Sequence, residues 1–144
     1  MRVEEERAGP PMSVHIKLRS SLWKANDLRL IENGVRSNTL LVGPALETLE
    51  ALAHIEGSLS PTVVEWPFDG APWTVDEEPG TVILHDVDAL GPDDQMRLLQ
   101  WLEGPGSRSQ VISLSSQPVL PLVLSGRFLD RLYYRLNVLY IEFS

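Results

Sequence analysis

The chain contains no cysteine among its 144 residues, which excludes disulfide bonds and thiolate metal sites. Basic residues are also scarce, because 12 Lys and Arg stand against 20 Asp and Glu, for a net charge of -8. Phosphate groups are neutralised by clustered Lys and Arg, so we expect no direct contact with nucleic acid. No apolar run approaches the roughly 20 residues of a membrane-spanning helix, and the charged start lacks the apolar core of a signal peptide. These absences predict a cytoplasmic protein without a membrane contact.

What is present predicts one globular domain, since 43% of the residues are hydrophobic and the length suffices for one core. Residues 1–15 are charged and then rich in Gly and Pro, which predicts a flexible N-terminal arm. Residues 16–144 alternate between the periods of strands and helices, which predicts an α/β domain with a five-stranded, mainly parallel sheet flanked by helices. Strands are predicted over residues 39–43, 61–66, 82–84, 110–115 and 136–143. Helices are predicted over residues 21–33, 46–55, 91–102 and 127–135.

Residues 80–90 form the stretch around which this pattern is organised. The apolar, β-branched run that begins at Val82 is typical of a central parallel strand buried on both faces. It ends at His85 and Asp86, so Asp86 is predicted to lie on the rim where open α/β sheets bind ligands. The next helix has acidic residues in its first turn, and a buried stripe is predicted for it at Met96, Leu98, Leu99 and Leu102. The helix before the second strand is predicted to be amphipathic, with an apolar set of Leu46, Leu49, Leu52, Ala53 and Ile55.

Two motifs carry a resemblance to a known family. The run GTVILHDVDALGPDDQMRLLQWLEG, residues 80–104, resembles the Walker B strand and following helix of the AAA+ domain in bacterial sigma-54-dependent transcriptional activators. The run SGRFLDRLYYRLNVLYIEF, residues 125–143, is similar to the GRFREDLYYRLNV segment of that family. With a vaguer match before them, the resemblance covers about residues 36–143. It implies a three-layer P-loop NTPase core without the helical lid domain, for which no sequence remains.

The turn after the first predicted strand departs from the phosphate-binding pattern of this family. A P-loop has the form GxxxxGK[ST], in which backbone N–H groups cradle phosphate and the Lys reaches the outer phosphates. Here the corresponding residues include Gly43, Pro44, Glu47 and Thr48, with one glycine, no lysine and an added carboxylate. Counted to His54, which matches the end of the family's helix, the segment is also about three residues short. The phosphate cradle is therefore expected to be missing.

The metal-binding motif also departs from the family pattern, separately from the phosphate-binding turn. The resemblance places the Walker B Asp, which orders the Mg²⁺ shell, at His85 and the residue that polarises the attacking water at Asp86. His85 supplies no anionic oxygen to a hard ion such as Mg²⁺. Asp86 keeps the charge of the family's Glu on a shorter side chain. We expect Gly43 and Asp86 to lie at neighbouring strand ends and to form a site without metal, cofactor or hydrolysis.

Two further functional positions of the family also differ here: the sensor residue is replaced, and the distal arginine lacks its companion arginine. The sensor Asn corresponds to Gln117, which offers the same hydrogen-bonding groups on a longer stem. The distal arginine, which in the family reaches the nucleotide of a neighbouring subunit, corresponds to Arg135, while its companion is Leu129. Without a bound phosphate, Arg127, Arg131 and Arg135 are better interpreted as one solvated basic stripe, because they recur every four residues. Such a stripe would suit an acidic partner surface.

The segment between the second strand and the Walker B strand is short. In the family this span carries a long insertion whose GAFTGA loop contacts sigma-54, whereas here about a dozen residues remain, with Gly70 and Ala71 as a remnant. A loop of this length is not expected to project and remodel sigma-54. The aromatic residues Trp66, Phe68 and Trp73 in this region form either an exposed docking patch or a cover over the sheet edge.

Two catalytic interpretations have little support. His85, Asp86 and Asp88 could hold a transition metal or resemble HD-type phosphohydrolases, but successive side chains on a strand point to opposite faces. Ser115 and Ser116 with a remote histidine could suggest a serine hydrolase, but no GxSxG turn is present.

The sequence therefore predicts a catalytically degenerate AAA+ domain of the sigma-54-activator type. Its expected role is protein interaction or regulation in transcription or signalling, without ATP hydrolysis. The partner would be an intact AAA+ activator, another signalling protein or a second copy of the chain. The alternatives are a regulator that binds ATP or ADP weakly, with Mg²⁺, and a fragment of a larger activator.

Overall fold

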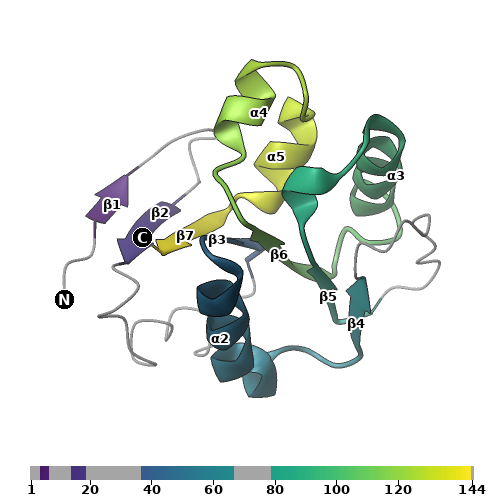
Figure 1. Cartoon of the computed structure of the whole chain (residues 1–144). Helices are drawn as coiled ribbons and strands as arrows, with labels where there is room; N and C mark the ends of the chain where they lie inside the picture. Colours follow the sequence, from purple (N-terminus) through teal and green to yellow (C-terminus); the bar gives the residue numbers. More distant parts are fainter. Residues whose placement is uncertain (1–3, 7–13, 19–36, 67–78, 144) are drawn as a thin grey trace.

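A seven-stranded sheet forms the centre of the computed structural model, which describes residues 4–6, 14–18, 37–66 and 79–143 (Figure 1). The strand order is β1-β2-β7-β3-β6-β5-β4, and β1 is the one described strand that runs antiparallel to its neighbour. The strands are β1 (Glu4–Glu6), β2 (Val14–Leu18), β3 (Thr39–Val42), β4 (Val63–Trp66), β5 (Thr81–Leu84), β6 (Gln110–Ser115) and β7 (Leu139–Phe143). The helices are α2 (Ala45–Ile55), α3 (Pro92–Leu102), α4 (Leu120–Leu124) and α5 (Asp130–Leu136), with 3-10 turns at Glu56–Ser58 and Val87–Ala89.

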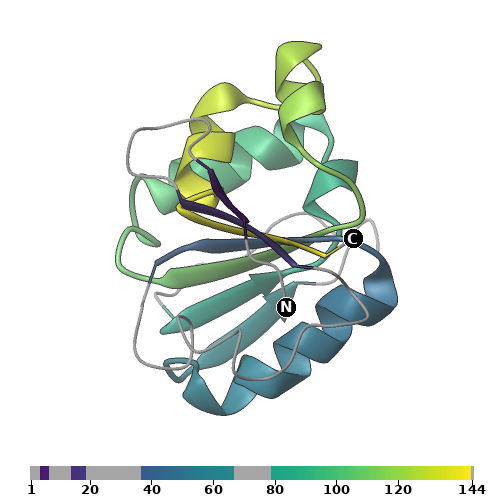
Figure 2. The ribbon, with the colours of Figure 1, turned by 90° about the vertical axis from the view of Figure 1, so that its left-hand side faces the viewer.

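The described helices cover both faces of the sheet, which gives three layers. Figure 2 shows α2 on one face and α3, α4 and α5 on the other. Successive strand residues point to opposite faces, so the sheet separates two hydrophobic clusters. On the α2 face, Leu41 and Ile112 pack in one cluster with Leu52. On the opposite face, Leu40 and Val111 belong to a cluster that includes α3 and α5.

The predicted α/β class is confirmed, and all five predicted strands are present as β3 to β7. The sheet has two strands more than predicted, because the N-terminal segment contributes β1 and β2. β2 pairs in parallel with β7, from Val14 opposite Leu139 to Leu18 opposite Phe143. The predicted arm, residues 1–15, therefore contains β1 and overlaps β2. The β2 sequence VHIKL alternates apolar and polar residues at every position, so a strand signal was present there and was missed when residues 1–15 were interpreted as an arm.

The inward face of α2 differs from the predicted one. Leu46 and Leu49 are 79% and 47% exposed, although an apolar stripe was predicted to include them. The buried residues include two predicted members, Leu52 and Ile55, together with Thr48 and Ala51, and the four follow the i, i+3, i+4, i+7 spacing of one helix face. The leucines at the start of the helix fall outside this face, so the first turn presents leucine to solvent and threonine to the core.

The same kind of shift occurs in α3. Met96 is 44% exposed, whereas the neighbouring Gln95 is 2% exposed. Gln95, Leu98, Leu99 and Leu102 have the spacing of a single inward face, and Met96 lies one position away from it. The predicted stripe was therefore wrong at its first member, because a polar residue occupies the buried position.

The remaining helices depart from their predicted limits, and one prediction lies outside the described residues. α5 begins at Asp130 rather than at residue 127, and α4 lies in the segment before it, where no helix was predicted. The helix predicted over residues 21–33 belongs to the part of the chain that is not described. The two longest described helices, α2 and α3, have 11 residues each, and none in the described segments has the length and apolarity to cross a membrane.

Candidate functional site

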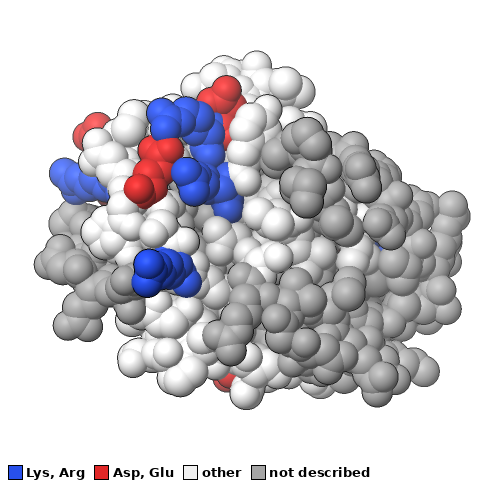
Figure 3. Space-filling model, turned by 180° about the vertical axis from the view of Figure 1, so that it is seen from behind, with Lys and Arg blue, Asp and Glu red and all other residues white. Residues whose placement is uncertain are grey.

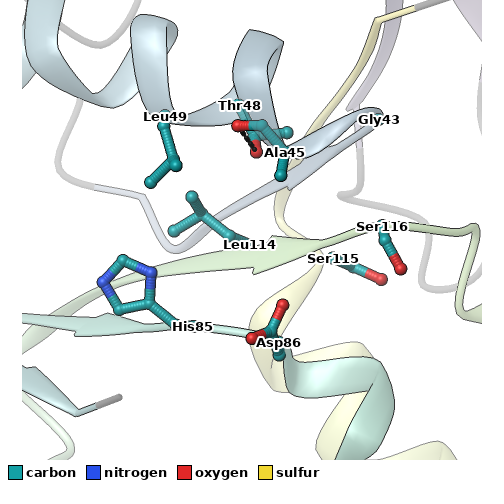
Figure 4. Close-up of a pocket in the computed structure, with 9 residues that line it drawn as sticks. All are labelled: Gly43, Ala45, Thr48, Leu49, His85, Asp86, Leu114, Ser115 and Ser116. Carbon is teal, nitrogen blue, oxygen red and sulfur yellow. Dashed lines mark hydrogen bonds between the residues drawn. The ribbon is translucent and has the colours of Figure 1, made fainter. Parts of the chain in front are cut away.

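A small pocket opens at the carboxyl ends of β3, β5 and β6, beside the first turns of α2 (Figure 4). This is the edge of the sheet at which open α/β folds bind ligands, as predicted. The cavity measures about 140 Å³. Its lining residues come from three strand ends and one helix, and they are Gly43, Ala45, Thr48, Leu49, His85, Asp86, Leu114, Ser115 and Ser116.

Gly43 holds the end of β3 against its neighbouring strands. Its N–H donates to the carbonyl oxygen of Ser115 at 3.0 Å, and its φ angle is +152°. A Cβ at this position would lie 2.8 Å from the carbonyl oxygen of Phe143. Both the backbone conformation and the close approach of β7 therefore require glycine here, whether or not phosphate binds.

The first turn of α2 uses its own polar groups. Pro44 is the N-cap, and its carbonyl accepts hydrogen bonds from the N–H groups of Glu47 at 3.0 Å and Thr48 at 3.1 Å. The hydroxyl of Thr48 donates to the carbonyl of Ala45 at 3.2 Å, and the side chain is 3% exposed. The Thr48 hydroxyl is thus turned toward its own helix, and the proline itself has no N–H to offer.

His85 and Asp86 follow β5 and point apart (Figure 4). The His85 ring nitrogen Nε2 lies 3.0 Å from Oε1 of Glu65, which belongs to the neighbouring strand β4. Asp86 is exposed and adopts a left-handed backbone conformation, with φ 54° and ψ 50°. Aspartate is enriched in this conformation relative to most residues other than glycine. The residue type at position 86 therefore has a backbone explanation as well as a chemical one.

The two strand ends that carry Gly43 and Asp86 are not adjacent, contrary to prediction. β6 lies between β3 and β5 in the sheet. Both residues nevertheless line the same pocket, on either side of Ser115 at the end of β6. The sequence pattern identifies strands but does not give their order in the sheet, so the intervening strand was missed.

Gln117, at the sensor position, is held by Asp88 in the 3-10 turn after β5. The Gln117 side-chain amide donates to Oδ2 of Asp88 at 3.3 Å, and the Ser116 hydroxyl donates to the same oxygen at 2.9 Å. Gln117 and Asp88 line a neighbouring groove that also includes Arg127, not the pocket beside Gly43. Position 88 was singled out only as a metal ligand, so this contact was missed.

The arginines of the predicted basic stripe lie on the face formed by α3 and α5. Arg131 forms an ion pair with Glu103, and Nη2 of Arg135 lies 3.6 Å from Oε2 of the same carboxylate. Arg127 precedes α5, so the three arginines do not share one helix. On the face seen in Figure 3, basic and acidic side chains lie beside one another. Arg135 does not line the pocket.

Of the three aromatic residues proposed as a docking patch, Trp66 is 8% exposed and belongs to the hydrophobic cluster on the α3 side. Trp66 therefore covers the sheet, which is the second of the two predicted alternatives, and is not part of an exposed patch, because this last residue of β4 points inward. Phe68 and Trp73, with the loop remnant Gly70 and Ala71, lie outside the described residues.

Comparison with known proteins adds the family. A family of sigma-54 interaction domains matches residues 37–144. The chain belongs to the sigma-54 interaction domain family. The comparison with curated protein sequences gives no match.

Two solved structures similar to this sigma-54 interaction domain are of NtrX from Brucella abortus, one in complex with ATP and one in complex with ADP. They have TM-scores of 0.63 and 0.60, each at 18% identity and over 84% of this chain. The chain covers 35% and 36% of the two NtrX chains, about a third of their length. At this identity the likeness shows the fold, and the predicted P-loop NTPase core of the AAA+ type is confirmed.

The chemistry available in the pocket of this sigma-54 interaction domain is limited. Its ionisable lining groups are His85 and Asp86, and no Lys or Arg is among the residues that line it. The described residues contain no group of three or more His, Asp or Glu placed to hold a metal ion. The hydroxyls of Ser115 and Ser116 donate to Gln117 and Asp88, not to a histidine, so the structure gives the hydrolase interpretation no support.

Proposed function

We propose that this sigma-54 interaction domain binds no nucleotide productively and acts by contacting another protein. The observation that carries the proposal is the pocket at the strand ends, which is lined by one carboxylate and no Lys or Arg. A triphosphate needs positive charge and free backbone N–H groups at this edge. Here the N-cap residue Pro44 has no N–H, and the Thr48 hydroxyl donates to the carbonyl of Ala45. These residues do not fit a Mg-nucleotide.

The size of the pocket and the Walker B position support the same proposal. Pockets for small ligands usually measure about 300–1,000 Å³, whereas this one measures about 140 Å³. His85 stands at the position of the metal-ordering aspartate and its ring is placed against Glu65. The phosphate-binding turn and the metal position are changed separately, while the strands that surround them are kept. Such a domain would regulate transcription or signalling in a bacterium through an intact AAA+ activator, a signalling protein or a second copy.

The alternative is a regulator that binds ATP or ADP weakly. It is favoured by the likeness to NtrX, which has been solved with both nucleotides, and by the place of the pocket at the carboxyl ends of the strands. In this case the pocket would have to widen, and Asp86 would have to hold Mg²⁺ near the phosphates.

Isothermal titration with Mg-ATP and Mg-ADP tests the two functions, with the NtrX protein as the positive control. We expect no saturable heat and no ATPase activity. A second measurement is thermal unfolding with nucleotide, because a ligand at 100 times its Kd would stabilise the protein by about 2.7 kcal/mol. Saturable binding at micromolar Kd, accompanied by a rise in Tm, would contradict the proposal.

A further inference from the structure

Charge is strongly segregated along this chain. Residues 37–96 contain no Lys or Arg but hold 12 of the 20 acidic residues, whereas residues 97–144 hold five arginines and three acidic residues. The first of these segments includes β3, α2, β4 and β5, and the second includes the strands and helices from β6 to β7. Within the described residues, α2 and the strand ends beside it therefore carry acidic groups without a Lys or Arg nearby in sequence, and the histidines there are His54 and His85.

α2 is the one described helix on its face of the sheet (Figure 2). Its inner side packs on the core, and its outer side is not covered by another described helix. Leu46, Leu49, Glu50 and Ala53 are exposed at i, i+3, i+4 and i+7 positions. Leu49 lies at the edge of this set, because its side chain also lines the pocket at the strand ends (Figure 4). We call these four residues the α2 outer face. Leu46 is 79% exposed, so most of its apolar side chain is accessible to a partner.

We propose that the α2 outer face docks a basic amphipathic helix of a partner protein. The two leucines, one turn apart, would meet the apolar stripe of that helix, in the manner of helix-in-groove recognition. Glu50 and Glu56 are exposed on and after α2, and Asp86 is exposed at the nearby strand end, so Lys or Arg beside the stripe would find acceptors. The inference rests on the proposed function, because it names the partner that a protein-binding domain of this kind would take.

The sign of the charge selects this partner over other macromolecules. An acidic surface repels the phosphates of nucleic acid and of anionic lipid headgroups. A basic protein segment is attracted to it, and charge complementarity also speeds the encounter.

A second copy of this chain fits less well, although its α3 and α5 carry arginines. Arg131 and Arg135 already contact Glu103, and Nη1 of Arg97 lies 4.0 Å from Oδ1 of Asp94. The arginine face of a second copy would have to give up these contacts before it could pair with α2. A separate basic helix has no such competing acidic groups.

The test uses the whole chain and a fluorescein-labelled synthetic peptide of 18 residues, in which leucines follow helical spacing and lysines fill the other positions. Fluorescence anisotropy in physiological salt should give saturable binding, and a charge-reversed peptide with glutamates in place of lysines should not bind. We expect the double variant Leu46→Ser with Leu49→Ser to weaken binding at least tenfold, and Glu50→Lys with Glu56→Lys to weaken it several-fold. Met96→Ser is the matched control, since Met96 is an exposed apolar residue on the opposite face, and it should leave the affinity unchanged.

Equal binding by the leucine double variant, with its circular dichroism spectrum unchanged, would overturn the inference. So would binding of the charge-reversed peptide, or a dimer in sedimentation that the leucine changes abolish, which would assign the face to a second copy. A nucleotide titration on the same preparations separates the two proposals. If the peptide does not bind and ATP does not bind either, the docking inference fails but the proposed function stands. If ATP binds, the proposed function is contradicted whether or not the peptide binds.

Discussion

Gly43 and Asp86 show that the residue type at a motif position can have a backbone explanation that is unrelated to the motif. Gly43 has a positive φ and lies against the backbone of β7, and Asp86 occupies a left-handed turn that few residues other than glycine adopt readily. Neither observation involves phosphate or metal. The fold alone therefore accounts for the residue type at both positions.

Replacement of Gly43 tests this structural role. We expect Gly43→Ala to lower the free energy of unfolding by about 1–3 kcal/mol, because this φ region is strained for residues with a Cβ and the new methyl group would meet the Phe143 carbonyl. Urea unfolding followed by circular dichroism measures the change. Gly57→Ala is the matched control, since a Cβ there would meet nothing within 4 Å, and its effect should stay within about 0.5 kcal/mol. Equal effects of the two substitutions would contradict this role for Gly43.

At the scale of elements, Gln95 joins α3 to the segment between α4 and α5. Its amide nitrogen donates to the carbonyls of Leu90 and Arg127, each at 2.9 Å. Its oxygen accepts a hydrogen bond from the N–H of Leu129 at 2.9 Å. All three side-chain contacts are therefore made to backbone, at a buried position that the predicted stripe, which began at Met96, did not include.

We expect Gln95→Leu to destabilise the fold by about 2–4 kcal/mol, because each buried backbone group left unpaired costs about 1–3 kcal/mol. Hydrogen exchange should also show faster exchange at the Leu129 N–H. Gln100→Leu on the exposed side of the same helix is the control and should change stability by less than about 0.5 kcal/mol. A stable Gln95→Leu variant with unchanged exchange would show that the apolar contacts of α3 alone hold this segment.

The positions of the strands and helices in the sequence could be predicted better than the helix faces that point into the core. The apolar strands and the two longer helices were identified by periodicity, because burial on one or both faces leaves a direct pattern. The inward faces of α2 and α3 were not, since Thr48 and Gln95 are buried through hydrogen bonds that a pattern of apolar residues does not reveal. The exposure of Trp66 could not be predicted either, because an aromatic residue at the end of a strand can point into the core or into solvent.

At the scale of the whole molecule, the site could be predicted as a set of strand ends but not as a geometry. The carboxyl ends of parallel strands share one edge of the sheet, so Gly43 and Asp86 were expected on the same side. Ser115, at the end of β6, lines the same pocket but was not predicted there. Their order depends on long-range pairing of strands, which places β6 between the other two. The partners of Gln117 and Arg135, namely Asp88 and Glu103, also lie far away in sequence, and no local pattern predicts such contacts.

The stability of the whole domain should fall at alkaline pH through Tyr133, a residue of α5 that is 1% exposed. Burial raises the pKa of its hydroxyl above the ordinary value of about 10, although the hydrogen bond with Asn137 lowers the pKa in part. The unfolded chain therefore releases this proton at lower pH than the folded chain. The contribution is present below pH 10 and is lost as the pH rises toward the folded pKa, with a slope of up to about 1.4 kcal/mol per pH unit.

Urea unfolding from pH 8 to pH 11 measures this effect in the natural chain and in Tyr133→Phe. We expect the stability of the natural chain to fall more steeply above pH 10 than that of the variant, because phenylalanine has no proton to release. The variant should differ by a constant amount below pH 10, where its missing hydroxyl removes only the hydrogen bond. Tyr134→Phe is the control, since Tyr134 is 43% exposed and should leave the slope as it is. Parallel curves for the natural chain and Tyr133→Phe would mean that the buried hydroxyl meets solvent before the domain unfolds.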